Sequence, residues 1–240
     1  MENFLLLASD ALTLTQFTFW IGFAAMLGAT LFFFSVMNMV DDKWKTSMLV
    51  AGLITGIAAL HYYYMRGAAG VGDDGVLTAY RYVDWILTVP LMCVEFYLIL
   101  AKAGATKKLM WNLIFASTVM LVCGYIGQAG DEVGSNTATI WGTISGLAYF
   151  WVAYTVWLGD AKALAVKAGG KVLEAHNALC WFVLVGWAIY PIGYMVGTYG
   201  WYNVILNDTF PLNMEVIYNV GDAINKIGFG LVIYNLAVSK

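Results

Sequence analysis

The sequence predicts an all-α membrane protein, a bundle of seven transmembrane helices, from its composition and its long apolar stretches. The chain has 240 residues, of which 61% are hydrophobic and 11% are charged, whereas a soluble domain carries about 25% charged residues. Seven apolar stretches reach the length of about 20 residues that a spanning helix needs. This composition excludes a typical soluble domain, a disordered chain and a nucleic-acid-binding protein.

The expected helices cover about 14–40, 44–65, 78–102, 107–127, 136–159, 173–197 and 211–237, within a single domain over 1–240. Polar, glycine-rich or charged segments separate them at 41–43, 67–75, 102–108, 131–135, 160–171 and 198–207. Because these connections are short, we expect successive helices to be antiparallel neighbours. Long apolar runs without alternation argue against a transmembrane β-barrel.

Basic residues of the connections and the C-terminus predict the orientation of the bundle. Arg66 alone falls on one side, and nine lysines fall on the other: Lys43, Lys45, Lys102, Lys107, Lys108, Lys162, Lys167, Lys171 and Lys240. Since cytoplasmic loops carry the excess of lysine and arginine, we expect the N-terminus outside and the C-terminus in the cytoplasm. The first seven residues contain no basic residue, so we expect them to belong to the mature protein rather than to a signal peptide.

Cysteines and histidines give no sign of a disulfide framework or a metal site. The three cysteines lie in apolar runs, and the two histidines are far apart in the sequence. Neither the number of cysteines nor the spacing of these residues matches known disulfide or zinc patterns. We therefore expect no bound metal.

Lys226 is the most informative charge, because it lies well inside the last expected helix. It is about 20 Å along the axis from the helix ends, too far for its side chain to reach water. Asp222, one turn earlier, could form an ion pair with it, and that pair alone would be structural. A buried ion pair gains little stability after desolvation. The alternative is an amine kept for covalent chemistry, since a buried lysine is the usual partner of an aldehyde in a Schiff base.

A second group of polar residues lies on one face of the third expected helix. Asp84, Thr88 and Glu95 are separated by four and seven residues, so they share that face. Arg81 lies one turn before Asp84. Each acid could be a helix-end residue that reaches water, although the short side chain of Asp84 fits this poorly. A proton relay needs an acid, a basic nitrogen and a second acid placed one after another across the membrane.

Two further expectations concern protons. Glu95 has apolar neighbours in the sequence, so we expect it to be protonated at rest and able to donate a proton. His61, in the second expected helix, lies at a depth where it could contact Asp84. A lone histidine on an apolar helix is as well explained as a hydrogen-bonded packing residue.

Three segments together resemble the microbial rhodopsins: RYVDWILTVPL at 81–91, GWAIYP at 186–191 and DAINK at 222–226. The resemblance extends over nearly the whole chain and is strongest to the proteorhodopsin and xanthorhodopsin branch of light-driven proton pumps. It implies an outward proton pump of the bacterial cell membrane rather than an enzyme. It also implies all-trans retinal bound to Lys226 as a protonated Schiff base.

The resemblance also implies roles for individual residues. Asp84 would be the primary counterion and proton acceptor, Asp222 the second counterion and Glu95 the cytoplasmic proton donor, while His61 matches a histidine that pairs with the acceptor. The resemblance also assigns a set of residues to a retinal pocket, and the alternative role of the aromatic ones among them is ordinary helix packing. The positions that match the retinal pocket are Trp85, Met92, Met120, Gly124, Trp187, Tyr190, Pro191 and Tyr194.

Several residues depart from the family pattern. Gln128 stands where many relatives have Glu, and Tyr149 replaces an expected Trp. Glu215 is a candidate for proton release or a solvated helix-end acid. Met92 occupies a colour-tuning position, where its apolar character resembles the green-absorbing type. Gly142 matches a glycine of xanthorhodopsin-like pumps that opens a window for a hydroxylated carotenoid antenna, and its alternative role is close helix packing.

Other functions remain open at this stage. A sensory rhodopsin of the same fold would act through a transducer, but such sensors usually lack a carboxylate at the position of Glu95. Sodium pumps of the family have Asn, Asp and Gln at positions 84, 88 and 95, and chloride pumps lack the acid at position 84, so neither matches this chain. A seven-helix receptor or transporter without retinal would leave Lys226 unexplained. As partners we expect the lipid bilayer and, by resemblance, further copies of the chain in a pentamer or hexamer, and no nucleic acid.

Overall fold

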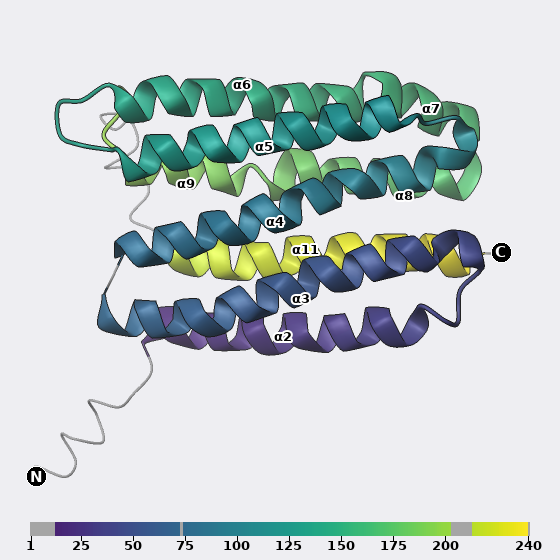
Figure 1. The fold of residues 1–240 in the computed structure, drawn as a ribbon, viewed down its shortest axis with the longest axis horizontal. Coiled ribbons are helices and arrows are strands. Elements are labelled where there is room, and N and C mark those ends of the chain that lie inside the picture. The colour runs from purple at the N-terminus through teal and green to yellow at the C-terminus, as the bar shows by residue number, and fades with distance from the viewer. Residues whose placement is uncertain (1–12, 73, 203–212, 240) are drawn as a thin grey trace, which may run out of the picture.

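The computed structural model describes residues 13–72, 74–202 and 213–239, and all regular elements within these ranges are helical. Figure 1 shows the helices lying side by side along one long axis, which is horizontal in this view. The helices of the first half are α2 (Leu14–Val36), α3 (Asp42–Val71), α4 (Asp74–Leu100), η1 (Ala101–Ala103) and α5 (Lys107–Ala129). Those of the second half are α6 (Thr137–Trp157), α7 (Asp160–Ala168), α8 (Gly170–Trp181), η2 (Phe182–Gly186), α9 (Ile189–Gly197) and α11 (Met214–Val238).

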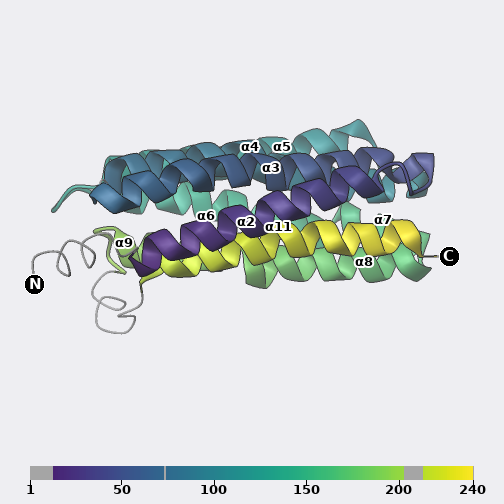
Figure 2. The ribbon, with the colours of Figure 1, turned by 90° about the horizontal axis from the view of Figure 1, so that it is seen from below.

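Neighbouring helices in the sequence are neighbours in space. The pairs α2–α3, α3–α4, α4–α5 and α5–α6 pack against each other, and α11 closes the bundle against α2, α3 and α8. Figure 2, seen from below, shows α3, α4 and α5 in one layer and α11 and α8 in the other. The antiparallel arrangement expected from the short connections is therefore present.

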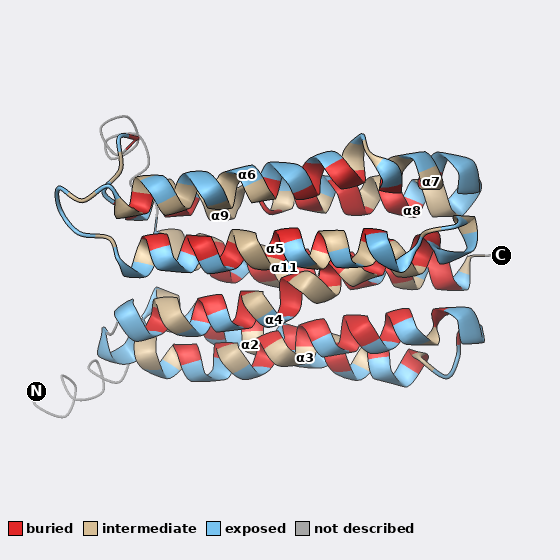
Figure 3. Cartoon of the chain, turned by 45° about the horizontal axis from the view of Figure 1, so that its top comes forward, coloured by how far each residue is buried: buried red, intermediate tan, exposed pale blue. Residues whose placement is uncertain are grey.

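The bundle has an apolar exterior and a partly charged interior. Leu31, Phe115 and Leu147 are more than 60% exposed on its outside, while Lys226 and Glu95 are buried inside. Figure 3 shows buried residues on the inward faces of the helices and exposed ones on the outward faces. Such an exterior suits lipid as the solvent, because hydrocarbon accepts the apolar side chains that water excludes.

Six helices are long and apolar enough to cross a membrane, considering the described residues alone. They correspond to the expected helices near 14–40, 44–65, 78–102, 107–127, 173–197 and 211–237. The fifth expected helix, 136–159, forms α6, but its Thr, Gly, Tyr and Trp residues lower its mean hydropathy, so it is not among the six. Seven spans and the orientation of the chain therefore stay predictions, and the predicted positions 203–207, 211–212 and Lys240 lie outside the described residues.

Two expected connections are more helical than predicted. α3 continues to Val71 and ends at Gly72, whose φ of 70° is a left-handed conformation that favours glycine. Asp160 to Ala168 also form a helix, α7, where the sequence predicts a connection. Its alanines favour helix, while Asp160 in the first turn and Lys167 in the last suit the helix dipole.

The expected helix 173–197 is not continuous. Between α8 and α9 the backbone widens into a π-helical turn, Phe182–Gly186. Pro191 lies in the first turn of α9 and has no N–H to donate. The interruption therefore lies beside the candidate pocket residues Trp187 and Tyr190.

Candidate functional site

Lys226 lies between two carboxylates in the interior of the bundle. Its Nζ is 2.5 Å from Asp84 Oδ2 and 2.7 Å from Asp222 Oδ2. α11 places Asp222 one turn before Lys226, and α4 contributes Asp84 from across the bundle. All three residues are at most 2% exposed. The structure thus brings together the lysine and the two acids that the sequence singled out in the third and last expected helices.

Tyrosine hydroxyls complete the hydrogen bonding of Asp222. Tyr190 donates to its Oδ1 at 2.8 Å, and Tyr62 donates to its Oδ2 at 3.1 Å. Tyr62 was not predicted from the sequence, because nothing separates it from the two tyrosines that follow it. Its complete burial distinguishes it only in the folded protein.

The carboxylate of Asp84 has fewer hydrogen-bond partners than that of Asp222. Its Oδ1 has no hydrogen-bond partner among the described residues, and His61 Nδ1 lies 4.0 Å from it. This histidine nitrogen instead hydrogen-bonds to the Ile57 carbonyl of its own helix at 2.9 Å. Thr88 donates to the backbone carbonyl of Asp84, at 2.9 Å, rather than to its carboxylate. His61 is thus a neighbour of Asp84, and the proposed pairing stays a prediction.

Arg81 faces away from the lysine and toward the start of α11. Its Nη2 donates to Glu215 Oε2 at 2.5 Å and to Asn219 Oδ1 at 3.1 Å. The guanidinium carbon also lies 5.1 Å from the centre of the Tyr218 ring. Asn219, whose amide donates to Thr18 at 3.0 Å, was missed by the sequence reasoning. Its place one turn before Asp222, in an apolar helix, is the pattern that could have identified it.

Glu95 is isolated in the other half of α4. It is fully buried, and neither carboxyl oxygen has a hydrogen-bond partner in the described part of the chain. Ser47 of α3 is a polar neighbour, and its buried hydroxyl also has no hydrogen-bond partner among the described residues. At 1.5 Å per residue, Glu95 lies about 16 Å along the helix axis from Asp84. The first acid and the amine of the expected series are therefore in contact, and the second acid lies about three turns further along α4.

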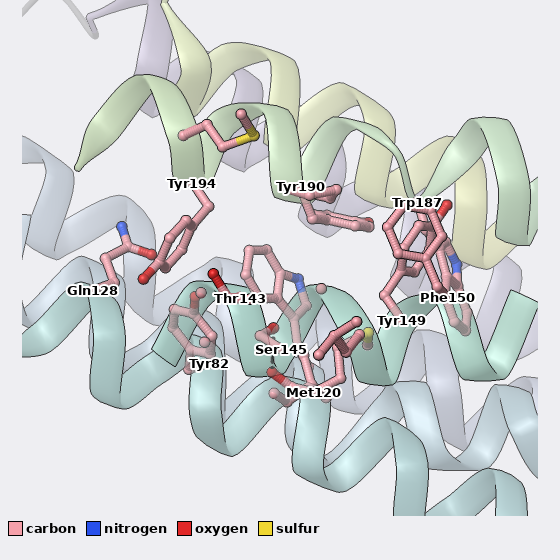
Figure 4. Close-up of a pocket in the computed structure, with 18 of the residues that line it drawn as sticks. Tyr82, Met120, Gln128, Thr143, Ser145, Tyr149, Phe150, Trp187, Tyr190 and Tyr194 are labelled. Carbon is pink, nitrogen blue, oxygen red and sulfur yellow. Dashed lines mark hydrogen bonds between the residues drawn. The ribbon is translucent and has the colours of Figure 1, made fainter. Parts of the chain in front are cut away.

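An apolar cavity of about 410 Å³ lies between α4, α5, α6 and α9. Figure 4 shows Tyr82 and Met120 on one side of it and Tyr190 and Tyr194 on the other. Of the residues predicted for the retinal pocket or carotenoid window, those that line it are Trp85, Met120, Gly124, Gly142, Trp187, Tyr190, Pro191 and Tyr194. Met92 is buried in the core, and neither it nor Lys226 is among the lining residues.

The cavity and the ion cluster are adjacent. Tyr190 lines the cavity and also donates to Asp222, the partner of Lys226. Trp85 lines it as well, and its buried Nε1 has no hydrogen-bond partner among the described residues. The volume and the aromatic lining are typical of a small-molecule pocket. Together they fit an elongated apolar ligand, and Lys226 lies just beyond the lining, behind the hydrogen bonds of Tyr190 to Asp222 and of Lys226 to Asp222.

Gly142 has a packing role in the structure. A Cβ atom at this position would lie 2.6 Å from Tyr194 Cε1, so glycine allows the tyrosine ring to pack against α6. The Tyr194 hydroxyl donates to the Ala138 carbonyl at 2.7 Å. The lining of the cavity nevertheless extends past Gly142 to Leu147 and Phe150, which are each 66% exposed on the outer surface.

Comparisons with known proteins identify the family of the chain. A sequence model of the family described as bacteriorhodopsin-like protein matches residues 13–240. The green-light absorbing proteorhodopsin of Gamma-proteobacterium EBAC31A08 is 44% identical over 234 residues, which cover 96% of this chain and 89% of the relative. The crystal structure of Exiguobacterium sibiricum rhodopsin has a TM-score of 0.79 and 31% identity, and the match covers 93% of this chain and 95% of that one. Xanthorhodopsin, described as a light-driven ion pump with dual chromophore, has a TM-score of 0.77 and 28% identity, with 93% and 92% covered. These matches confirm the resemblance seen in the three sequence segments, and the chain belongs to the bacteriorhodopsin-like protein family.

Proposed function

We propose that this protein is a light-driven outward proton pump that binds all-trans retinal through Lys226. The observation that carries the proposal is the buried Lys226 amine, held at 2.5 Å from Asp84 and 2.7 Å from Asp222. When bound, retinal supplies the absorption of light and an isomerisation that changes how the Lys226 nitrogen faces its neighbours. The similarity to a green-light absorbing proteorhodopsin supports the same function.

The two acids beside the lysine have different roles in this proposal. Asp84 Oδ2 accepts the proton from the lysine nitrogen, since it is the nearest oxygen and its other oxygen has no hydrogen-bond donor among the described residues. Asp222 stays ionised as the second counterion, because Tyr62 and Tyr190 both donate to it. Hydrogen bonds from neutral donors favour the charged form of a carboxyl group.

Glu95 returns a proton to the lysine nitrogen from the other side. Its carboxyl group is buried, and neither oxygen has a hydrogen-bond partner in the described part of the chain. A carboxyl group without charged or donating partners is most stable in its neutral form, so Glu95 holds a proton that it can give up. Arg81 keeps Glu215 and Asn219 in place beyond the acceptor.

The test is light-driven acidification. Bacterial cells that express the chain with added all-trans retinal are illuminated in unbuffered salt, and the external pH is followed with an electrode. We expect acidification that a protonophore abolishes and that the Lys226→Ala variant lacks. A coloured protein that moves no protons would overturn the pump and support the sensory alternative. Absence of colour in the parent protein would overturn retinal binding itself.

A second proposal is that a hydroxylated carotenoid acts as an antenna beside Gly142. It is supported by the exposed lining residues Leu147 and Phe150 and by the likeness to xanthorhodopsin, described as having a dual chromophore. The packing of Tyr194 against Gly142 is the competing explanation. The excitation spectrum for pumping, recorded with and without carotenoid, distinguishes them. We expect a carotenoid band that Gly142→Phe removes, and absence of the band in the parent protein would refute the antenna.

A further inference from the structure

The widened turn between α8 and α9 changes which backbone groups are paired. In an α-helix each carbonyl accepts from the N–H four residues later. Here the Trp187 N–H donates to the Phe182 carbonyl at 2.9 Å, so Val183 loses its usual partner. The Ala188 N–H donates to the carbonyl three residues back at 3.3 Å, so Leu184 loses its partner as well.

Pro191 leads to the loss of the backbone donor of a third carbonyl, that of Gly186. Because proline has no N–H, the Trp187 carbonyl cannot accept from it and accepts instead from the Tyr190 N–H at 3.1 Å. In a regular helix the Tyr190 N–H would donate to Gly186. The Gly186 carbonyl is therefore also left without a backbone donor.

Side chains from two other helices donate to these three carbonyls. The Tyr149 hydroxyl of α6 contacts the Val183 carbonyl at 3.0 Å and the Leu184 carbonyl at 3.1 Å. The Asn225 amide of α11 donates to the Gly186 carbonyl at 2.9 Å. Since an unpaired buried carbonyl is costly, the turn depends on both side chains.

The two donors also connect the turn to the lysine and to the cavity. Asn225 precedes Lys226, and its amide lies 3.4 Å from the hydroxyl of Tyr190, which itself binds Asp222. On the other side, Figure 4 shows Tyr149 beside Trp187, and both line the cavity. A shift of the turn would therefore move groups in contact with both the ion cluster and the pocket.

We propose that Tyr149 and Asn225 are positioning residues that hold the widened turn from opposite sides and so set where Trp187 and Tyr190 stand relative to Lys226. This inference rests on the proposed function for its effect on a bound pigment, but the hydrogen bonds themselves do not. Gly186 belongs to the same arrangement. A Cβ atom there would lie 3.0 Å from Asn225 Cγ, so Gly186→Ala displaces the amide without changing Asn225 itself.

The test compares Tyr149→Phe, Asn225→Ala and Gly186→Ala with a control, Tyr154→Phe, which alters a 54% exposed tyrosine of the same helix. The first measurement is hydrogen–deuterium exchange of the backbone at 183–190 in the retinal-free protein. We expect exchange about tenfold faster in the three variants, the factor that loss of one buried hydrogen bond produces, and no change in the control. This measurement does not depend on retinal.

The second measurement is the absorption maximum after retinal is added. We expect Asn225→Ala and Gly186→Ala to shift it in the same direction, and the combination to shift it no further than either alone, because both act on one contact. Exchange unchanged in all three variants would overturn the proposal, as would faster exchange without any shift in absorption. If Tyr149→Phe does not fold, Gly186→Ala and Asn225→Ala still decide the question. A parent protein without a pigment would refute the proposed function, while the exchange result would still test the turn.

Discussion

Neutralising the two carboxylates around Lys226 should have a strongly non-additive effect on stability. In the single variants Asp84→Asn and Asp222→Asn, one carboxylate still faces the amine, at 2.7 Å or 2.5 Å respectively. The loss of a charged hydrogen bond costs about 1.5–3 kcal/mol. Relief of the repulsion between two acids that share one amine offsets part of it, so we expect about 1 kcal/mol for each single substitution.

The double variant leaves a fully buried lysine without a counterion. Removing the partner of a buried charge costs about 3–5 kcal/mol, so the double variant should lose about 1–3 kcal/mol more than the sum of the two single effects. The assay is equilibrium unfolding of the retinal-free protein in mixed micelles with increasing sodium dodecyl sulfate. Asp41→Asn, whose side chain is 76% exposed, serves as the control and should change nothing. Additive losses would refute the view that the two acids share one lysine.

Four further predictions concern the retinal-loaded protein. Lys226→Ala should show no visible absorption band, whereas a normal band would place the attachment elsewhere. Asp84→Asn should shift the band to longer wavelength and stop light-driven acidification, and retained pumping would refute its role as acceptor. Glu95→Gln should keep the colour but slow the recovery of the dark state in flash photolysis, and an unchanged photocycle would contradict its role as donor. The colour should move to longer wavelength as the pH falls and Asp84 takes up a proton, and His61→Ala should displace the midpoint of that titration; an unmoved midpoint would refute the pairing.

The centre of the site could be predicted from the sequence because helical geometry constrains it. A lysine and an acid one turn apart must share a face of α11, and a polar face at the same depth of α4 has to turn inward in an apolar chain. These two facts bring Lys226, Asp84 and Asp222 together without knowledge of the loops. Burial then follows, since lipid cannot satisfy the charges.

The partners of Arg81 could not be predicted in the same way. Its long side chain reaches Glu215 and Asn219 near the start of α11, and such a contact depends on the relative shift of two helices that are distant in sequence. The hydrogen bonds from Tyr62 and Tyr190 to Asp222 present the same difficulty, although the resemblance places Tyr190 in the pocket. Many tyrosines are compatible with ordinary packing, and only the three-dimensional arrangement of α3, α9 and α11 selects Tyr62 and Tyr190.

The widened turn was missed for a different reason. Pro191 predicts a disturbance of the helix, but it does not determine which carbonyls are released or which side chains bind them. Tyr149 was noticed as a departure from the family pattern, and its hydroxyl proves to contact two of those carbonyls. The unexpected tyrosine in α6 thus has a partner in the widened turn between α8 and α9. Neither feature is interpretable alone in the sequence.

The two halves of the bundle differ in how their buried acids are bound, and this difference supports a direction for proton movement. Around Lys226, hydrogen bonds connect Asp84 and Asp222 to the lysine, and Tyr62 and Tyr190 extend the contacts of Asp222. In the other half, neither oxygen of Glu95 has a hydrogen-bond partner among the described residues. A proton on the lysine nitrogen therefore has an acceptor in contact on one side and none on the other. In the proposed pump the first transfer is therefore favoured toward Asp84, and Glu95 would act only after the interior between it and Lys226 has changed.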